Sequence, residues 1–129
     1  MLCDIDHFKS VNDRFAHATG DEVLRRVGDI LQQSVRSSDL VARYGGEEFV
    51  VAFPETQLSH ARDACEALRK RVEAYPWHEV HPDLRITISL GLCGDTQVAS
   101  FDRMLAVADT QLYQAKRSGR NQVCVAMEA

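Results

Sequence analysis

Apolar residues recur along the chain with two periods, and the change from one to the other outlines the expected elements. Helical spacing predicts helices over the ranges 8–15, 23–35, 58–72 and 101–115. Thr19 and Glu22 are expected to form a capping box at the start of the second helix. Pro76 follows the end of the third helix, and Gly119 closes the fourth.

Alternating apolar residues with many β-branched side chains mark the strands. The segments expected to be strands are 40–44, 47–53, 85–93 and 122–125, and LCDID at 2–6 resembles the end of a strand whose beginning is absent. Gly45-Gly46 joins two of these strands as a hairpin, which Pro54 stops. No repeat or linker interrupts the chain. This order predicts one α/β (α+β) domain over 1–129, with helices covering a mostly antiparallel or mixed sheet.

The composition fits a globular domain with a proper core. The chain has 129 residues, of which 45% are hydrophobic and 26% charged. No apolar run approaches the roughly 20 residues of a membrane span, and the start turns acidic too early for a signal peptide. We therefore expect a cytoplasmic domain that makes no membrane contact. A net charge of −4 argues against a surface that follows a nucleic-acid backbone.

The cysteines are scattered singly and lie within apolar patterns. There is no C-x-x-C motif, so buried free thiols are favoured over metal ligands or disulfides. The four positions are Cys3, Cys65, Cys93 and Cys124.

The segment RYGGEEF at 43–49 places two acids directly behind two glycines. One explanation is a surface turn in which glycine is needed for a positive φ. Another is that the absent side chains let a bulky ligand approach the backbone. The segment alone does not separate the two.

Two acidic clusters that are distant in sequence could meet in the fold. They are Asp4 with Asp6, and Glu47 with Glu48. If the first strand lies beside the hairpin, Asp4 and Glu47 can face each other, and they would repel unless a cation lies between them. Hard oxygen ligands select Mg²⁺ or Mn²⁺, which is the chemistry of metal-assisted phosphoryl transfer. This first hypothesis is a metal-dependent nucleotidyl transferase; alternatively, the acids are simply solvated.

Several cations and polar groups could serve a nucleotide. Lys116 and Arg120 could contact a triphosphate, or they could only complement the dipole at a helix end. The segment 7–9 could offer backbone N–H groups at a helix N-terminus to phosphates. Asn12 and Asp21 could read a base edge, although Asp21 also suits the first turn of a helix.

The motifs together resemble those of one family. The blocks DIDHFKSVND, HATGDEVL, RSSD, RYGGEEF, TISLG and LYQAKRSGRN occur in the order and spacing of the GGDEF domain of diguanylate cyclases, in its GGEEF form. The resemblance covers the chain from end to end. It implies a palm-like nucleotidyl cyclase fold in which two GTP molecules, one on each of two domains, condense to cyclic di-GMP and two pyrophosphates.

The same resemblance implies partners and cofactors. Each 3′-hydroxyl attacks the α-phosphate of the partner's GTP, so a homodimer is needed. Each active site takes two Mg²⁺ or Mn²⁺ ions. Family members usually receive their signal through an upstream regulatory domain, and cyclic di-GMP inhibits them at an R-x-x-D motif.

The family's site residues fall on specific positions of this chain. The metal ligands are Asp4, the backbone carbonyl of Ile5 and Glu47, and the catalytic acids are Asp4, Glu47 and Glu48. The GTP-binding positions are the backbone of His7, Phe8 and Lys9, the guanine contacts Asn12 and Asp21, the glycines Gly45 and Gly46, and the cations Lys116 and Arg120. The inhibitory site falls on Arg36 and Asp39.

The chain departs from the family pattern in three places. It starts at the end of the first strand, whereas the family has an earlier helix with a D-x-L-T segment, so we expect an N-terminally truncated domain. Ala16 replaces a usual glycine and adds strain of about 1 kcal/mol if the turn needs a positive φ. Ala67 stands where some members place another arginine for the inhibitory product.

Two other functions compete with the cyclase. A binding module would hold cyclic di-GMP or GTP without turnover, but the complete set of acids and cations disfavours a pure receptor. Another palm-type enzyme, such as a nucleotide cyclase or a polymerase, is disfavoured by the guanine-reading pair and the acidic pI of about 5.7. Product formation from GTP separates the cyclase from both.

Overall fold

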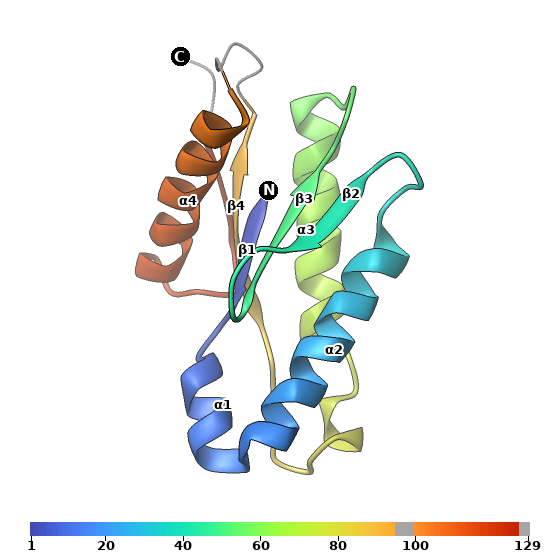
Figure 1. Ribbon diagram of the computed structural model, residues 1–129, viewed down its shortest axis with the longest axis vertical. Coiled ribbons are helices and arrows are strands. Elements are labelled where there is room, and N and C mark those ends of the chain that lie inside the picture. The colour runs from blue at the N-terminus through green and yellow to red at the C-terminus, as the bar shows by residue number, and fades with distance from the viewer. Residues whose placement is uncertain (95–99, 127–129) are drawn as a thin grey trace.

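A computed structural model describes residues 1–94 and 100–126 (Figure 1). Its centre is a sheet with the strand order β2-β3-β1-β4-β5. The strands are β1 (Leu2–Ile5), β2 (Leu40–Arg43), β3 (Glu48–Ala52), β4 (Ile88–Cys93) and β5 (Val123–Ala126). The pairing of β4 with β5 is parallel, and the other three pairings are antiparallel. The prediction of a mostly antiparallel mixed sheet is therefore confirmed.

Helices cover both faces of this sheet, as the α/β prediction requires. The α-helices are α1 (Phe8–Phe15), α2 (His17–Ser34), α3 (Leu58–Ala74) and α4 (Phe101–Arg117), and η1 (Trp77–Glu79) is a short 3-10 helix. The helices α2 and α3 lie on one face and α4 lies on the other (Figure 1). The short helix α1 follows β1 directly and packs against α2.

The central strand β1 is buried on both faces, so its side chains do not alternate between core and solvent. Cys3 belongs to the large core formed with α2 and α3, which includes Val27 and Leu68. Leu2 belongs to the smaller core under α4, together with Leu112. This double burial fixes where the end of β1 lies relative to α4.

Two predicted boundaries are wrong. The helix α2 begins at His17, ahead of Thr19, with Ala16 as its N-cap and no side-chain cap, so the capping box does not form. Glu22 instead pairs with the arginines on the next turn of α2. The predicted strand 85–93 begins only at Ile88, because β1 ends at Ile5, which pairs with Ile88. Beyond this pair, the Thr87 carbonyl accepts one hydrogen bond, of 3.0 Å, from the Asp6 N–H.

The cysteines are free thiols, as predicted. Cys3, Cys65 and Cys93 are buried, while Cys124 is only half-buried. Burial raises the pKa of the Cys3 and Cys65 thiols to about 12. Within residues 1–94 and 100–126, no helix combines the length and apolar character needed to cross a membrane.

The turn between α1 and α2 carries backbone strain. Ala16 has φ 78° and ψ 164°, a region that residues other than glycine rarely adopt. The condition under which the sequence predicts strain at Ala16 is therefore met.

We predict that Ala16→Gly raises the free energy of unfolding by about 1 kcal/mol, because glycine adopts this conformation without a Cβ clash. The matched control is Ala18→Gly, on the first turn of α2, which should lower stability by up to about 1 kcal/mol. Urea denaturation of both variants tests this. A fall in stability with Ala16→Gly would contradict the strain.

Candidate active site

The pairing of β1 with β3 brings the two acidic clusters together. Asp4 lies opposite Glu48 in the register of the two strands. One residue further on, the Ile5 N–H donates to the Glu47 carbonyl at 3.2 Å. The strands are antiparallel, so the end of β1 meets the start of β3 at the tip of the β2–β3 hairpin (Figure 1). The condition for the two acidic clusters to meet, that the first strand lies beside the hairpin, is therefore met.

The glycines at the hairpin tip do not serve the turn through a left-handed conformation. Among the described residues, Gly119 is the only glycine with a positive φ. A Cβ on Gly46 would meet nothing within 4 Å, whereas one on Gly45 would lie 2.9 Å from Glu48 Oε1. The explanation by a positive φ is therefore wrong. Gly46 borders open space, and Gly45 leaves room for the Glu48 carboxylate.

Arg43 holds the hairpin tip through backbone carbonyls. Its Nε donates to the Gly45 carbonyl at 3.2 Å, and its Nη2 donates to the Gly46 carbonyl at 2.6 Å. The Tyr44 N–H donates to the Glu48 carbonyl at 2.8 Å. The backbone around the paired glycines is therefore fixed by its own chain.

Asp4 is a buried acid with one cationic partner, Lys116 on α4. Only 5% of Asp4 is exposed, and burial raises the pKa of its carboxyl. The hydrogen bond and charge of Lys116 act in the opposite direction, while the charges of Glu47 and Asp6 raise the pKa further. Lys116 Nζ donates to Asp4 Oδ2 at 2.5 Å. Burial, followed by the charge of Asp4, also raises the pKa of Glu48.

The donor chemistry of this site fits a hard divalent cation. Asp4, Glu47 and the Ile5 carbonyl offer oxygen donors, and burial, together with the smaller effect of the neighbouring acids, raises the pKa of Asp4. Among the described residues, no group of three or more His, Cys, Asp or Glu side chains is already arranged around a metal position. Lys116 contacts Asp4 Oδ2 instead, so an ion that binds through this oxygen would replace the contact.

The start of α1 lies directly after this end of β1. Its N-cap, His7, has φ 55° and ψ 33°, and the first helical residues Phe8 and Lys9 follow. The predicted phosphate-binding N–H groups therefore belong to a helix N-terminus that is two residues from the end of β1.

The packing of α1 on α2 places the Asn12 side chain against Gly20, the residue before Asp21. A Cβ on Gly20 would lie 1.9 Å from Asn12 Oδ1, so the Asn12 side chain crosses α2 where glycine makes space. Asp21 is the next residue of α2 and is exposed. The contact with Gly20 places Asn12 beside the turn of α2 that carries Asp21.

Arg120 lies in the segment that joins α4 to β5. Asp6 is the first residue after β1. Arg120 is exposed and has φ 65°. Asp6 is 5% exposed and accepts hydrogen bonds from Thr87, Ser89 and the Asn121 N–H. The sequence grouped Asp6 with Asp4 and gave no signal for these partners, because they are distant in the chain.

Arg36 and Asp39 form a pair between α2 and β2. Arg36 Nη2 donates to Asp39 Oδ1 at 3.1 Å, and the Arg36 N–H donates to Asp39 Oδ2 at 2.9 Å. Arg36 Nη2 also donates to Thr56 Oγ1 at 2.5 Å. The Asp39 side chain is 3% exposed, while that of Arg36 is 58% exposed. The motif is therefore a buried carboxylate that orients an exposed guanidinium.

The pKa of Asp39 responds to this pairing. Burial by itself raises it, but the hydrogen bonds from the Arg36 side chain and backbone outweigh burial and lower the pKa below its usual 3.8. A carboxyl with a lowered pKa in the folded state stabilises the fold above its usual pKa. This contribution is lost as the pH falls through the lowered value.

Comparisons with known proteins agree with the geometry. Residues 1–122 match the family model described as the GGDEF domain of diguanylate cyclases. The response regulator PleD from Caulobacter vibrioides is 46% identical over 130 residues, which cover 95% of this chain. The chain spans only 28% of the length of PleD.

Solved structures show the same arrangement of elements. The active GGEEF domain of a diguanylate cyclase from Vibrio cholerae superposes with a TM-score of 0.90 at 30% identity, covering 99% of this chain and 81% of that one. The GGDEF domain of DgcB from Caulobacter crescentus, solved in complex with c-di-GMP, gives a TM-score of 0.89 at 35% identity. It covers 96% of this chain and 74% of that one.

We predict opposite effects on stability when either partner of the Asp4–Lys116 pair is removed in metal-free buffer at neutral pH. Asp4→Asn removes a costly buried charge, so the free energy of unfolding should rise by up to about 1 kcal/mol. Lys116→Met leaves that charge without its partner and should lower stability by about 1–2 kcal/mol, less than for a fully buried pair because 35% of the Lys116 side chain is exposed. Urea denaturation with a chelator measures both; equal losses would contradict this account.

Proposed function

The chain belongs to the GGDEF-domain family of diguanylate cyclases, and on this premise we propose that it condenses two GTP molecules into cyclic di-GMP and two pyrophosphates. The observation that carries the proposal is the meeting of Asp4, at the end of β1, with the Gly-Gly-Glu-Glu hairpin tip. It joins buried acids, a cation and an open backbone at one end of the sheet. Relatives named diguanylate cyclases support the same activity.

In this proposal Asp4, Glu47 and the Ile5 carbonyl hold Mg²⁺ or Mn²⁺, with two ions per site when GTP is bound. These ions supply Lewis-acid chemistry, which favours ionisation of the attacking 3′-hydroxyl and offsets charge on the phosphates. Glu48 adds a further carboxylate beside Asp4, and its raised pKa fits a group that gains from a nearby cation.

The remaining residues bind and orient GTP. The N–H groups of His7, Phe8 and Lys9 donate to the phosphate oxygens at the start of α1, where the helix dipole favours anions. Lys116 leaves Asp4 and, with Arg120, binds the triphosphate.

The guanine and the approach of GTP involve a second group of residues. Asn12 and Asp21 hydrogen-bond the guanine edge, since an amide and a carboxylate together match its donors and acceptors. Gly46 lets the nucleotide approach the hairpin, because no side chain occupies the space beside it.

Turnover needs two copies of this domain. Each holds one GTP, and each 3′-hydroxyl attacks the α-phosphate of the other, so a homodimer forms the product. We further propose that a longer parent protein, containing the segment the family has before residue 1, brings the domains together through an upstream regulatory domain. The net charge of −4 fits a cytoplasmic nucleotide enzyme that contacts neither nucleic acid nor membrane through this domain.

Arg36 and Asp39 form the proposed inhibitory site for cyclic di-GMP. Asp39 fixes the guanidinium, and the exposed side of Arg36 remains able to pair with guanine or phosphate. The DgcB domain was solved with c-di-GMP, which supports a product site in the family. Ala67, exposed on α3, offers no second guanidinium, so we propose weaker inhibition than in members with arginine there.

The contact between Lys116 and Asp4 favours one competing function. A domain in which this pair persists would bind GTP or cyclic di-GMP without turnover. Product formation by a dimer, measured with GTP and Mg²⁺, decides between the cyclase and the binding module.

We predict that Glu47→Gln abolishes product formation while Asp63→Asn, at an exposed acid on α3, leaves it unchanged. The amide keeps the size of Glu47 but lacks the charge that holds the ion. Cyclic di-GMP is quantified by chromatography after the dimerised protein is incubated with GTP and Mg²⁺. Full activity of Glu47→Gln would rule out its role as a metal ligand.

We predict that Arg36→Ala weakens cyclic di-GMP binding by about 10-fold or more, because a bidentate, charged donor is lost. Arg103→Ala removes an exposed arginine from α4, on the other face of the sheet, and serves as the control. Calorimetric titration with cyclic di-GMP measures both affinities. Unchanged binding by Arg36→Ala would place the product elsewhere.

A further inference from the structure

Three consecutive residues after α4 have positive φ angles. They are Gly119 at 118°, Arg120 at 65° and Asn121 at 47°. Glycine adopts such angles freely, but arginine does so rarely, and such strain persists only where surrounding contacts fix the backbone. The segment therefore needs contacts that hold it, and two independent sets of contacts converge on Asn121.

The first set comes from the exit of β1. Asp6 Oδ2 accepts the Asn121 N–H at 3.0 Å and the Thr87 hydroxyl at 2.7 Å, and Oδ1 accepts the Ser89 hydroxyl at 2.6 Å. Asp6 is 5% exposed, and these three donors hold its carboxylate in place. It locks the backbone immediately after Arg120.

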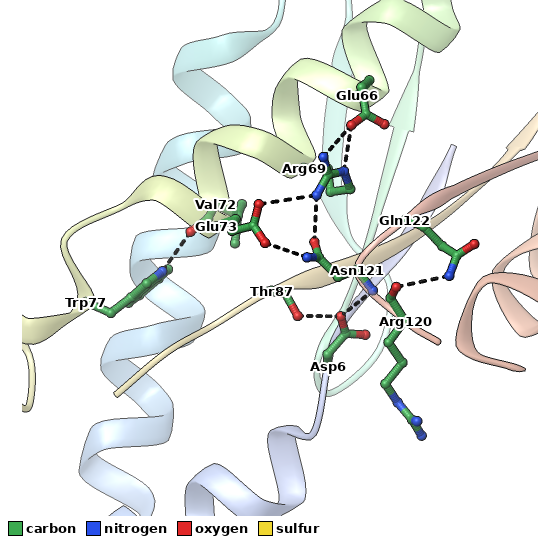
Figure 2. A network of polar contacts seen from close by, with 10 residues as sticks. All are labelled: Asp6, Glu66, Arg69, Val72, Glu73, Trp77, Thr87, Arg120, Asn121 and Gln122. Atoms are coloured by element: carbon green, nitrogen blue, oxygen red, sulfur yellow. Dashed lines mark hydrogen bonds and ion pairs between the residues drawn. The ribbon is translucent and has the colours of Figure 1, made fainter. Parts of the chain in front are cut away.

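The second set comes from α3 and acts on the Asn121 side chain (Figure 2). The Asn121 amide nitrogen donates to Glu73 Oε2 at 2.6 Å, and its oxygen accepts from Arg69 Nη1 at 2.9 Å. Arg69 is 14% exposed and is held in turn by Glu66, at 2.5 Å. Both the nitrogen and the oxygen of the Asn121 amide are thus hydrogen-bonded to charged side chains of α3.

These contacts fix the backbone at Arg120 and therefore the direction in which its side chain leaves the chain. The Arg120 N–H donates to the Ala115 carbonyl at 2.9 Å, and the N–H of the next residue, Asn121, donates to Asp6. Figure 2 shows the guanidinium extending away from the α3 network, past Asp6. Asp6 lies two residues after Asp4, which holds Lys116, so the end of β1 locates both proposed phosphate-binding cations.

We propose that Asp6, Asn121 and Glu73 are positioning residues: through the strained turn, they aim the Arg120 guanidinium at the triphosphate of bound GTP. This inference rests on the proposed function. Glu73 lies on α3 and acts on Arg120 only through Asn121. A merely structural network would join α3 to the sheet without affecting nucleotide affinity.

Glu66 and Glu73 provide a matched pair of variants. Each pairs with Arg69 from the exposed face of α3, but only Glu73 also accepts the Asn121 amide. We expect Glu73→Ala to weaken GTP-analogue binding by about 3- to 10-fold, the effect of one lost hydrogen bond. Glu66→Ala leaves Arg69 paired with Glu73 and bonded to Asn121, so it should weaken binding less than Glu73→Ala does, with a similar change in melting temperature.

The probe is 3′-deoxy-GTP with Mg²⁺, which lacks the attacking hydroxyl and therefore reports binding without turnover. Calorimetry is carried out on both variants, on Arg120→Ala and on the double variant Arg120→Ala/Glu73→Ala. If Glu73 acts through Arg120, the double variant binds no more weakly than Arg120→Ala alone. Asn121→Gly provides a second test, because glycine accepts the positive φ but lacks the amide, and it should match Glu73→Ala.

The outcomes separate this inference from the proposed function. Absence of binding by the unaltered protein would overturn both. Binding that Arg120→Ala weakens, but Glu73→Ala and Asn121→Gly do not, would overturn only the positioning role. Equal losses of affinity in Glu66→Ala and Glu73→Ala, or additive losses in the double variant, would likewise show that the network only stabilises the fold.

Discussion

The burial of β1 between two strands and two helical layers is the constraint on which the site depends. Antiparallel pairing with β3 places the Asp4 carboxylate beside the acids of the hairpin tip, in a position where burial disfavours its charge. The packing of Leu2 under Leu112 seats α4 on the same strand and brings Lys116 within reach. Burial disfavours the charge of this acid, and Lys116 on α4 offsets part of that cost.

The same strand end organises the segment after α4. Asp4 contacts Lys116, and Asp6 contacts the backbone of Asn121, the residue after Arg120. The end of β1 therefore positions both cations of the proposed triphosphate site. Helix α3, on the opposite face, reaches the site through the Asn121 amide. The acids, the cations and the open hairpin backbone together form an arrangement suited to binding a metal-nucleotide complex.

The sequence was sufficient for the type and order of the elements, because periodicity and turn residues are local signals. The approach of Asp4 to the hairpin was only a hypothesis, since it depends on the pairing of β1 with β3. It did not reveal where α2 begins, since this depends on the unusual φ of Ala16 rather than on Thr19. The partners of Asp6 and the contact of Lys116 with Asp4 also escaped prediction. Both arise from strand register and helix packing between residues that are far apart in the chain.

The central claim is that the end of β1 and the hairpin tip share a divalent ion that takes the place of Lys116. The most direct measurement is the anomalous diffraction of crystals grown with Mn²⁺ and 3′-deoxy-GTP. The account predicts an Mn²⁺ peak about 2.1 Å from carboxylate oxygens of both Asp4 and Glu47, with Lys116 Nζ on a phosphate. A nucleotide-bound crystal in which Lys116 still contacts Asp4, and no ion joins the two acids, would contradict it.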